Sequence, residues 1–227
     1  MCAGLGTRMR PLTDTMPKPL VPILGKGTLE RILEILPEAI TRVIIVEHYL
    51  GEQIKEKIGT ASHGRPIVYV HQDPLDGSGG TVRHTKEHVP DLSDRFLVIN
   101  GDDLYAAEDL AKLVQVPFGL LILEMIAPRD IDVCRVEDGK VVGFSSVQKG
   151  EPGIINIGAY LFDHRWFNTT PTLVPGKTVE YSLPHVIPEL VAKGVEIIAI
   201  PATFWLPVGT PEELKKAEEV IGDKWIV

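Results

Sequence analysis

The sequence has few cysteines and no long apolar run, and each of these absences excludes a class of protein. Cys2 and Cys134 are its only cysteines; their spacing fits neither a disulfide framework nor a zinc motif, so we expect free, packed thiols in a reducing compartment. No apolar stretch approaches the ~20 residues that cross a bilayer, and the first residues lack the order of a secretory signal. The sequence therefore predicts a cytoplasmic protein that does not enter a membrane.

Basic residues are also scarce, with 23 Lys and Arg against 31 Asp and Glu and a formal net charge of −8. Because no Lys/Arg block is present, the chain lacks the electrostatic basis for a broad grip on nucleic acid. A few focused cations can still hold a small anionic ligand. At 227 residues the chain can bury its own core, so we expect one domain over residues 1–227, and we leave open whether it forms a homo-oligomer.

Short apolar runs alternate with segments of helical period in the first half of the chain. The runs predict buried strands, and the periodic segments, in which apolar residues recur every three or four positions, predict helices. The predicted strands are 42–47, 66–70 and 96–100, and the predicted helices are 29–36, 54–58, 81–89 and 107–114. Such alternation favours an α/β fold in which helices cover both faces of a mostly parallel sheet.

The second half of the chain is predicted to be more antiparallel. Asp138-Gly139 separates two strand-like segments and is a strong hairpin signal. We expect a helix over 183–193 despite two prolines, and a closing helix that starts at Pro211. The predicted strands are 119–125, 132–136, 140–147, 155–162 and 195–200.

The loop near the start of the chain has the composition of a phosphate-binding loop. Gly4-Leu5-Gly6-Thr7-Arg8 offers backbone N–H groups, a hydroxyl and a guanidinium to anionic oxygens. It has neither the ending of a P-loop nor the third glycine of a dinucleotide fingerprint, which leaves a dinucleotide-dependent oxidoreductase with little support. Taken alone, the loop is equally compatible with an ordinary turn.

Two further motifs follow this loop, Pro11-Leu12-Thr13 and Pro17-Lys18-Pro19-Leu20. The combined pattern resembles the signature of the sugar-1-phosphate nucleotidyltransferase family, and the resemblance continues over nearly the whole chain. It implies a three-layer, Rossmann-like α/β fold with a mixed, mostly parallel central sheet. The nucleotide would bind the half formed by residues 1–115, and the sugar phosphate the half formed by 116–227. The triphosphate would be held by Gly4, Leu5, Gly6, Thr7, Arg8 and Lys18.

The same resemblance assigns residues to the base and to a metal ion. It implies that Gln72 and a glycine-rich turn read the base, and that Asp102, after Gly101, binds the Mg²⁺ that bridges the phosphates. Mg²⁺ fits because it prefers oxygen ligands, often one or two carboxylates with phosphates and water. Asp103 is either a supporting oxygen donor or a cap for the next helix. The glycines implied in nucleotide binding are Gly77, Gly79, Gly80 and Gly101.

In the second half, the resemblance implies that four residues bind the sugar phosphate. Lys149 would neutralise the phosphate, Asn156 would face the sugar, Gly158 would leave it room, and Glu180 occupies a more loosely matched position. Gln148 stands where the family usually has a glutamate, which predicts a different choice of sugar or a non-sugar acceptor.

Two departures from the family pattern bear on activity. Pro207 replaces the aspartate that is the second metal ligand, so we expect weaker or less well oriented metal binding. Only three residues precede Gly4, where the family has a buried central strand, so we expect the native protein to begin further upstream, with Cys2 and Ala3 as the tail of that strand.

The sequence thus predicts a nucleotidyltransferase that joins an NTP, with UTP or dTTP favoured, to a sugar 1-phosphate, with a hexose 1-phosphate favoured, and releases pyrophosphate. Two alternatives stay open. One is a cytidylyltransferase acting on choline, glycerol or inositol phosphate. The other is a non-catalytic homologue that binds nucleotide or nucleotide sugar and regulates a partner.

Overall fold

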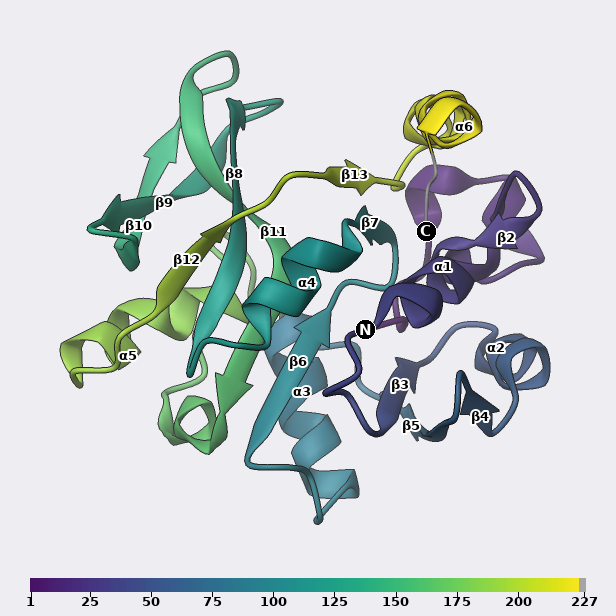
Figure 1. The fold of residues 1–227 in the computed structure, drawn as a ribbon, viewed down its shortest axis with the longest axis horizontal. Coiled ribbons are helices and arrows are strands. Elements are labelled where there is room, and N and C mark those ends of the chain that lie inside the picture. The colour runs from purple at the N-terminus through teal and green to yellow at the C-terminus, as the bar shows by residue number, and fades with distance from the viewer. Residues whose placement is uncertain (225–227) are drawn as a thin grey trace. The chain divides into compact units, whose positions relative to one another are not determined.

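The computed structural model describes residues 1–224, and their packing divides the chain into two compact units (Figure 1). Unit 1 comprises Met1–Pro74, Asn100–Ala107 and Phe204–Val227, and unit 2 comprises Leu75–Ile99 and Glu108–Thr203. Each unit therefore combines segments that lie far apart in the sequence. The functional division at residue 115 is a separate matter and stays a prediction.

The strands of unit 1 form three small sheets within the described residues. In the first, β3 and β5 pair in parallel and β4 pairs antiparallel with β5; the other two are the antiparallel pairs β1–β2 and β7–β13. Cys2 adds an isolated parallel bridge to Glu47 at the end of β3. The strands are β1 (Pro22–Ile23), β2 (Lys26–Gly27), β3 (Val43–Glu47), β4 (Ala61–Ser62), β5 (Arg65–His71), β7 (Asp103–Tyr105) and β13 (Trp205–Pro207).

The helices of unit 1 bury the apolar stripes that the sequence predicted. Leu29 and Leu33 of α1 pack in one cluster with Ile45 of β3 and Ile54 of α2. The start of α1 is fixed by Glu30, whose carboxylate accepts the Gly27 N–H at 2.9 Å. The helices are α1 (Thr28–Ile35), α2 (Gly51–Ile58) and α6 (Pro211–Lys224), with short 3₁₀ turns η1 (Thr7–Met9), η2 (Leu12–Asp14) and η3 (Lys18–Leu20).

Unit 2 is built on a six-stranded sheet of order β6-β11-β8-β12-β10-β9. Only β8 and β12 pair in parallel within it, which confirms that the second half of the chain is more antiparallel. This sheet is therefore mixed, and it is less parallel than the mostly parallel sheet that the sequence predicted. Phe118, Phe162 and Trp166 pack ring against ring in its core. The strands are β6 (Arg95–Ile99), β8 (Gly119–Ile126), β9 (Ile131–Glu137), β10 (Lys140–Val147), β11 (Pro152–Asp163) and β12 (Ile198–Pro201).

The turn between β9 and β10 confirms the predicted hairpin. Asp138 and Gly139 have φ angles of 48° and 71°, and such left-handed conformations match the twist of a two-residue hairpin turn. Lys140 is paired with Glu137 directly across the turn. The Asp138-Gly139 turn therefore sets the register of the two strands.

The helices of unit 2 lie on both faces of its sheet, with α4 on the near side and α3 on the far side in Figure 1. The helix predicted over 183–193 is shorter than expected, because the two prolines confine it to a 3₁₀ turn followed by α5. The helix predicted over 81–89 begins earlier, at Gly77. The elements are α3 (Gly77–His88), α4 (Ala107–Leu113), α5 (Ile187–Ala192), η4 (His164–Asn168) and η5 (Pro184–Val186).

The early start of α3 depends on close packing between two backbones. The Gly79 N–H donates to the Tyr181 carbonyl at 2.9 Å, and the Tyr181 N–H donates to the Asp76 carbonyl at 2.6 Å. A β-carbon on Gly79 would lie 2.7 Å from the Ser182 carbonyl oxygen, closer than van der Waals contact allows. Glycine is therefore required where the first turn of α3 meets the segment around Tyr181.

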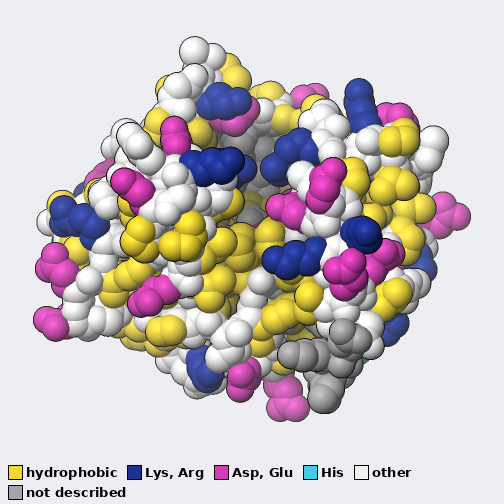
Figure 2. Space-filling model, turned by 90° about the horizontal axis from the view of Figure 1, so that it is seen from above, with side chains coloured by type: hydrophobic (Ala, Val, Ile, Leu, Met, Phe, Trp, Pro, Cys, Tyr) yellow, Lys and Arg dark blue, Asp and Glu magenta, His cyan; other side chains and the backbone are white. Residues whose placement is uncertain are grey.

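Charged side chains of both signs share the surface, and the cysteines lie inside. On the face drawn in Figure 2, Lys and Arg side chains are interspersed with Asp and Glu. No helix of the described residues has the length and apolar character that crossing a membrane requires. Both cysteines are buried and unbridged, which confirms the prediction of free thiols.

We predict that neither thiol reacts readily in the native protein. Each cysteine is 4% exposed, and burial raises the pKa of Cys134 to about 12, so little of the nucleophilic thiolate exists at pH 8. Titration with a chromogenic disulfide reagent at pH 8 should detect almost no thiol in the native chain and two in denaturant. Rapid reaction of either cysteine in the native chain would contradict this burial.

We also predict that Gly79→Ala lowers the free energy of unfolding by about 1–3 kcal/mol, because the new methyl group displaces the backbone at Ser182. The matched control is Gly222→Ala in α6, where the nearest heavy atom to the new β-carbon is a Leu24 methyl at 3.8 Å. That control should gain up to about 1 kcal/mol from helix propensity. Urea unfolding measures both variants, and a Gly79 variant as stable as its control would refute the close approach.

Candidate functional site

The opening loop is shaped by a contact between Gly6 and Thr13. Gly6 has a φ of 65°, its carbonyl accepts the Thr13 hydroxyl at 2.7 Å, and a β-carbon on it would lie 3.0 Å from the Thr13 side chain. Nothing lies within 4 Å of a β-carbon placed on Gly4, and Leu5 is 45% exposed. A negatively charged group can therefore approach the backbone here closely.

Lys18 and Asp102 form an ion pair. Lys18 begins η3 between two prolines, and such a restricted backbone leaves its side chain less entropy to lose when it is aimed. Its side chain is 10% exposed, whereas that of Asp102 is 35% exposed. The structure thus brings together a lysine and an aspartate that the sequence singled out separately.

The Asp102 turn is fixed by its backbone contacts. The Gly101 N–H donates to the Met1 carbonyl at 2.9 Å, and the Gly101 carbonyl accepts the Thr28 hydroxyl at 2.7 Å. A β-carbon on Gly101 would lie 2.5 Å from the Cys2 sulfur, so no other residue fits without a shift of the turn. On the other side, the Val208 N–H donates to the Asp102 carbonyl at 3.0 Å.

Asp103 lies beside this turn but faces the interior. It is 7% exposed, and its carboxylate accepts the Asn100 amide at 3.1 Å. Burial, and secondarily the charge of Asp102, raise the pKa of Asp103 to about 7. Pro207 is its partner in the β7–β13 register. Asp102 is therefore the more accessible of the two carboxylates, and one such oxygen donor meets the minimum for Mg²⁺, which fills its other positions with phosphate and water.

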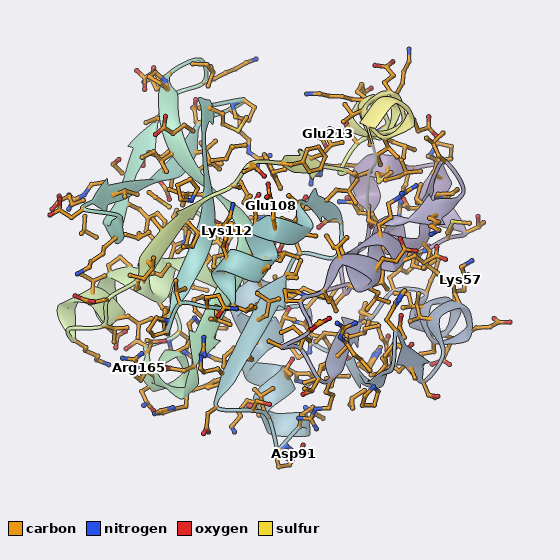
Figure 3. All side chains as sticks on the ribbon, viewed as in Figure 1. Lys57, Asp91, Glu108, Lys112, Arg165 and Glu213 are labelled. Carbon is orange, nitrogen blue, oxygen red and sulfur yellow. The ribbon has the colours of Figure 1, made fainter. Side chains whose placement is uncertain are left out.

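Two cations and one carboxylate converge on Gly209. A β-carbon there would lie 3.0 Å from a Glu213 oxygen, 3.2 Å from an Arg8 guanidinium nitrogen and 3.4 Å from the Lys18 ammonium nitrogen. Glu213, labelled at the start of α6 in Figure 3, accepts the Gly209 N–H at 2.7 Å. Glu213 is not among the site residues that the sequence predicted, although Thr210 and Glu213 have the spacing of a capping box, which could have indicated it.

Gln72, the residue expected to read the base, is 1% exposed in unit 1. Its backbone N–H donates to the Glu47 carbonyl at 2.9 Å, and its carbonyl oxygen pairs with the His48 ring at 2.8 Å. Its position just after β5 agrees with the sequence. Its side chain is more buried than polar side chains at the ends of strands usually are.

The residues expected to bind the sugar phosphate lie in unit 2 together with Gly77, Gly79 and Gly80. Gly158 has a φ of 78° where the register of β11 shifts, and the Asn156 side chain accepts the Tyr160 hydroxyl. Lys149 lies on the turn between β10 and β11, and Glu180 pairs with Lys177 at 3.2 Å. In the described part of the chain, no hydrogen bond links Lys149, Asn156 or Glu180 to one another.

A Ser-His-Asp chain that the sequence did not suggest supports the segment after Glu180. The His185 ring lies 2.7 Å from the Ser182 hydroxyl and 2.9 Å from the Asp132 carboxylate, which also accepts the Ser146 hydroxyl at 2.7 Å. These bonds lower the pKa of Asp132, with Ser146 contributing most and His185 next. This chain of hydrogen bonds tethers the Tyr181–Ser182 segment to β9. Because Ser182 is only 3% exposed, its hydroxyl is too enclosed to serve as a nucleophile.

Solved structures of similar fold include a UDP-glucose pyrophosphorylase complexed with UDP-glucose and the CTP:phosphocholine cytidylyltransferase of Streptococcus pneumoniae. The first has a TM-score of 0.79 and 21% identity over 98% of this chain and 96% of its own. The second has a TM-score of 0.73 and 22% identity over 97% of this chain and 96% of its own. These likenesses confirm the predicted Rossmann-like α/β fold class with a mixed sheet.

Sequence comparison identifies the family, whereas the solved structures show the fold alone. The bifunctional protein GlmU of Methanocaldococcus jannaschii is 30% identical over 99% of this chain, but the match spans only 54% of that relative. A family model for nucleotidyl transferases matches residues 1–117. Because this match covers more than half of the 227 residues, the chain belongs to the nucleotidyl transferase family.

Proposed function

We propose that this protein transfers a nucleoside monophosphate from an NTP to a sugar 1-phosphate and releases pyrophosphate. The observation that carries the proposal is the convergence of Arg8 and Lys18 on Gly209, with Asp102 paired to Lys18. Two focused cations next to an open glycine loop suit a polyphosphate, even on a chain whose net charge is −8.

In the proposed reaction, a phosphate oxygen of the sugar 1-phosphate attacks the α-phosphorus in line. A new P–O bond forms as the bond between the α-phosphorus and its bridging oxygen breaks, and pyrophosphate takes the electron pair. The attacking phosphate, with a second pKa near ~6, is already largely dianionic at neutral pH, so no protein base has to remove a proton. Arg8 and Lys18 act by holding two anions together and stabilising the charge that moves onto the leaving group.

Asp102 is the residue that would hold Mg²⁺. The ion would supply charge neutralisation on the phosphate oxygens. The chain's own contribution is to fix the backbone of Gly101 through Met1 and Thr28, and that of Asp102 through Val208, so that the carboxylate is in place before ligands arrive.

The acceptor and the base are assigned on weaker support. We propose Lys149, Asn156, Gly158 and Glu180 for the sugar phosphate, and Gln72 with the glycines at the start of α3 for the base. The amide of Gln72 favours UTP or dTTP, since it can donate and accept at a pyrimidine edge. The unbridged thiols favour a cytoplasmic location.

A cytidylyltransferase acting on a phosphorylated alcohol is the second candidate. Gln148 leaves room for a non-sugar acceptor, and the likeness to a phosphocholine cytidylyltransferase fits the same interpretation at the level of fold. A pyrophosphate-release screen of five NTPs against sugar 1-phosphates and choline, glycerol and inositol phosphates separates the two. Release only with CTP and a non-sugar acceptor would replace the first proposal with the second.

We predict that Lys18→Ala lowers turnover about 10²–10³-fold, the usual effect of losing one preorganised group that stabilises developing charge. The matched control is Lys57→Ala, which removes an exposed ion pair with Glu30 at 3.2 Å on another surface. Pyrophosphate release should be unchanged in the control, because exposed pairs contribute little. Far-UV circular dichroism checks that both variants fold, and normal turnover by a folded Lys18 variant would refute the proposed role.

We further predict that Pro207→Asp lowers the Mg²⁺ concentration needed for half-maximal pyrophosphate release, because it adds a third carboxylate to the pair formed by Asp102 and Asp103. Without Mg²⁺ the same change should lower thermal stability, since three acidic groups then repel one another. Pro207→Asn is the control, because it supplies an oxygen without a charge. Equal Mg²⁺ dependence of the Asp variant and wild type would show that residue 207 does not face the metal.

A further inference from the structure

Beyond the proposed function, we propose that α3 carries a separate site for a divalent transition metal, formed by His84, Glu87 and His88. These residues stand three and four positions apart, so they lie on one face of the helix. Their ligand atoms all lie within 4.8 Å of one another. Among the side chains that the structure describes, residues 1–222, no other group of three meets this criterion.

The two imidazoles are already close. Their ring centroids are 4.0 Å apart, and the His84 Nδ1 atom lies 4.0 Å from a Glu87 carboxylate oxygen. Metal–nitrogen and metal–oxygen bonds of about 2.0–2.2 Å require ligand atoms that are slightly closer than this. Small side-chain rotations would therefore complete the site, and the helix backbone would not need to move.

One tautomer is fixed by the backbone. The His88 Nδ1 atom lies 2.9 Å from the His84 carbonyl oxygen, and because a carbonyl only accepts, this nitrogen carries the proton. The lone pair of neutral His88 is then on Nε2. A histidine that donates one ring N–H to a carbonyl is oriented in the way that metal-binding histidines usually are.

The donor set selects the class of metal. Two imidazoles with one carboxylate suit Zn²⁺, Ni²⁺ or Cu²⁺, whereas Mg²⁺ and Ca²⁺ prefer oxygen ligands throughout. His84 is partly buried and the other two residues are exposed, so water can fill the remaining positions. The site is therefore open to exchange with metal in solution.

Such a site would stabilise a helix of weak intrinsic propensity. Three of the 12 residues of α3 are glycines, and glycine is among the weakest helix formers. A metal that bridges two consecutive turns holds the ligands only while the helix is formed, so binding favours the folded helix. The bridged turns lie at the end of α3 opposite Gly77, Gly79 and Gly80.

Isothermal titration with Zn²⁺, in a buffer containing excess Mg²⁺ to occupy oxygen-only sites, tests the proposal. We expect one Zn²⁺ per chain and a rise in melting temperature with Zn²⁺. His84→Ala and His88→Ala should each weaken binding at least about tenfold, and Glu87→Gln should weaken it less. His164→Ala, which removes an exposed histidine in η4, is the matched control and should bind as wild type does.

Two outcomes would overturn the site. One is no Zn²⁺ binding by the wild-type chain. The other is wild-type affinity in both histidine variants, which would mean that zinc binds elsewhere. If a histidine variant fails to fold, Glu87→Gln and His88→Gln keep the test decisive, because they preserve side-chain volume. The result does not depend on pyrophosphate release, so failure here leaves the proposed transferase activity untouched.

Discussion

The ion pair between Lys18 and Asp102 joins two segments that are 84 residues apart in the chain. A lysine whose side chain is 10% exposed needs a counter-charge, because burying an ammonium without one is costly. The prolines on either side of Lys18 and the packed turn at Gly101 keep both partners in place. Arg8 and Glu213 then complete a cluster of charges around Gly209, and the balance of that cluster depends on this pair.

Close backbone packing at glycine recurs at the positions that matter most. Gly101 lies against Met1 and Cys2 in unit 1, and Gly79 lies against Ser182 in unit 2. A β-carbon at either position would fall within 2.7 Å of another atom. In both cases the glycine serves the fold first, and any close approach of a nucleotide comes in addition to that constraint.

Local charge and overall charge give different information in this protein. The net charge of −8 argues against a broad surface that binds polyanions such as nucleic acid. Arg8 and Lys18 nevertheless concentrate positive charge near Gly209. Pro207 stands where the family pattern has an aspartate, so this neighbourhood has one carboxylate fewer than that pattern. Asp103, which is paired with Pro207 across β7 and β13, is buried and accepts a hydrogen bond from Asn100. The cations proposed here for phosphoryl transfer are thus present, whereas the proposed metal site has one carboxylate fewer than the family pattern.

The sequence by itself determined the α/β class, the helix around Leu29 and Leu33, the hairpin at Asp138-Gly139 and the motifs around Arg8, Lys18 and Asp102, because each depends on local periodicity, turn chemistry or a short pattern. It missed the β7–β13 pair, whose three-residue strands are too short to show a period, and the start of α3 at Gly77. Only the tertiary structure brought Lys18 to Asp102 and His185 to Asp132. These contacts join residues 84 and 53 positions apart through packing and charge pairing, which no local pattern encodes.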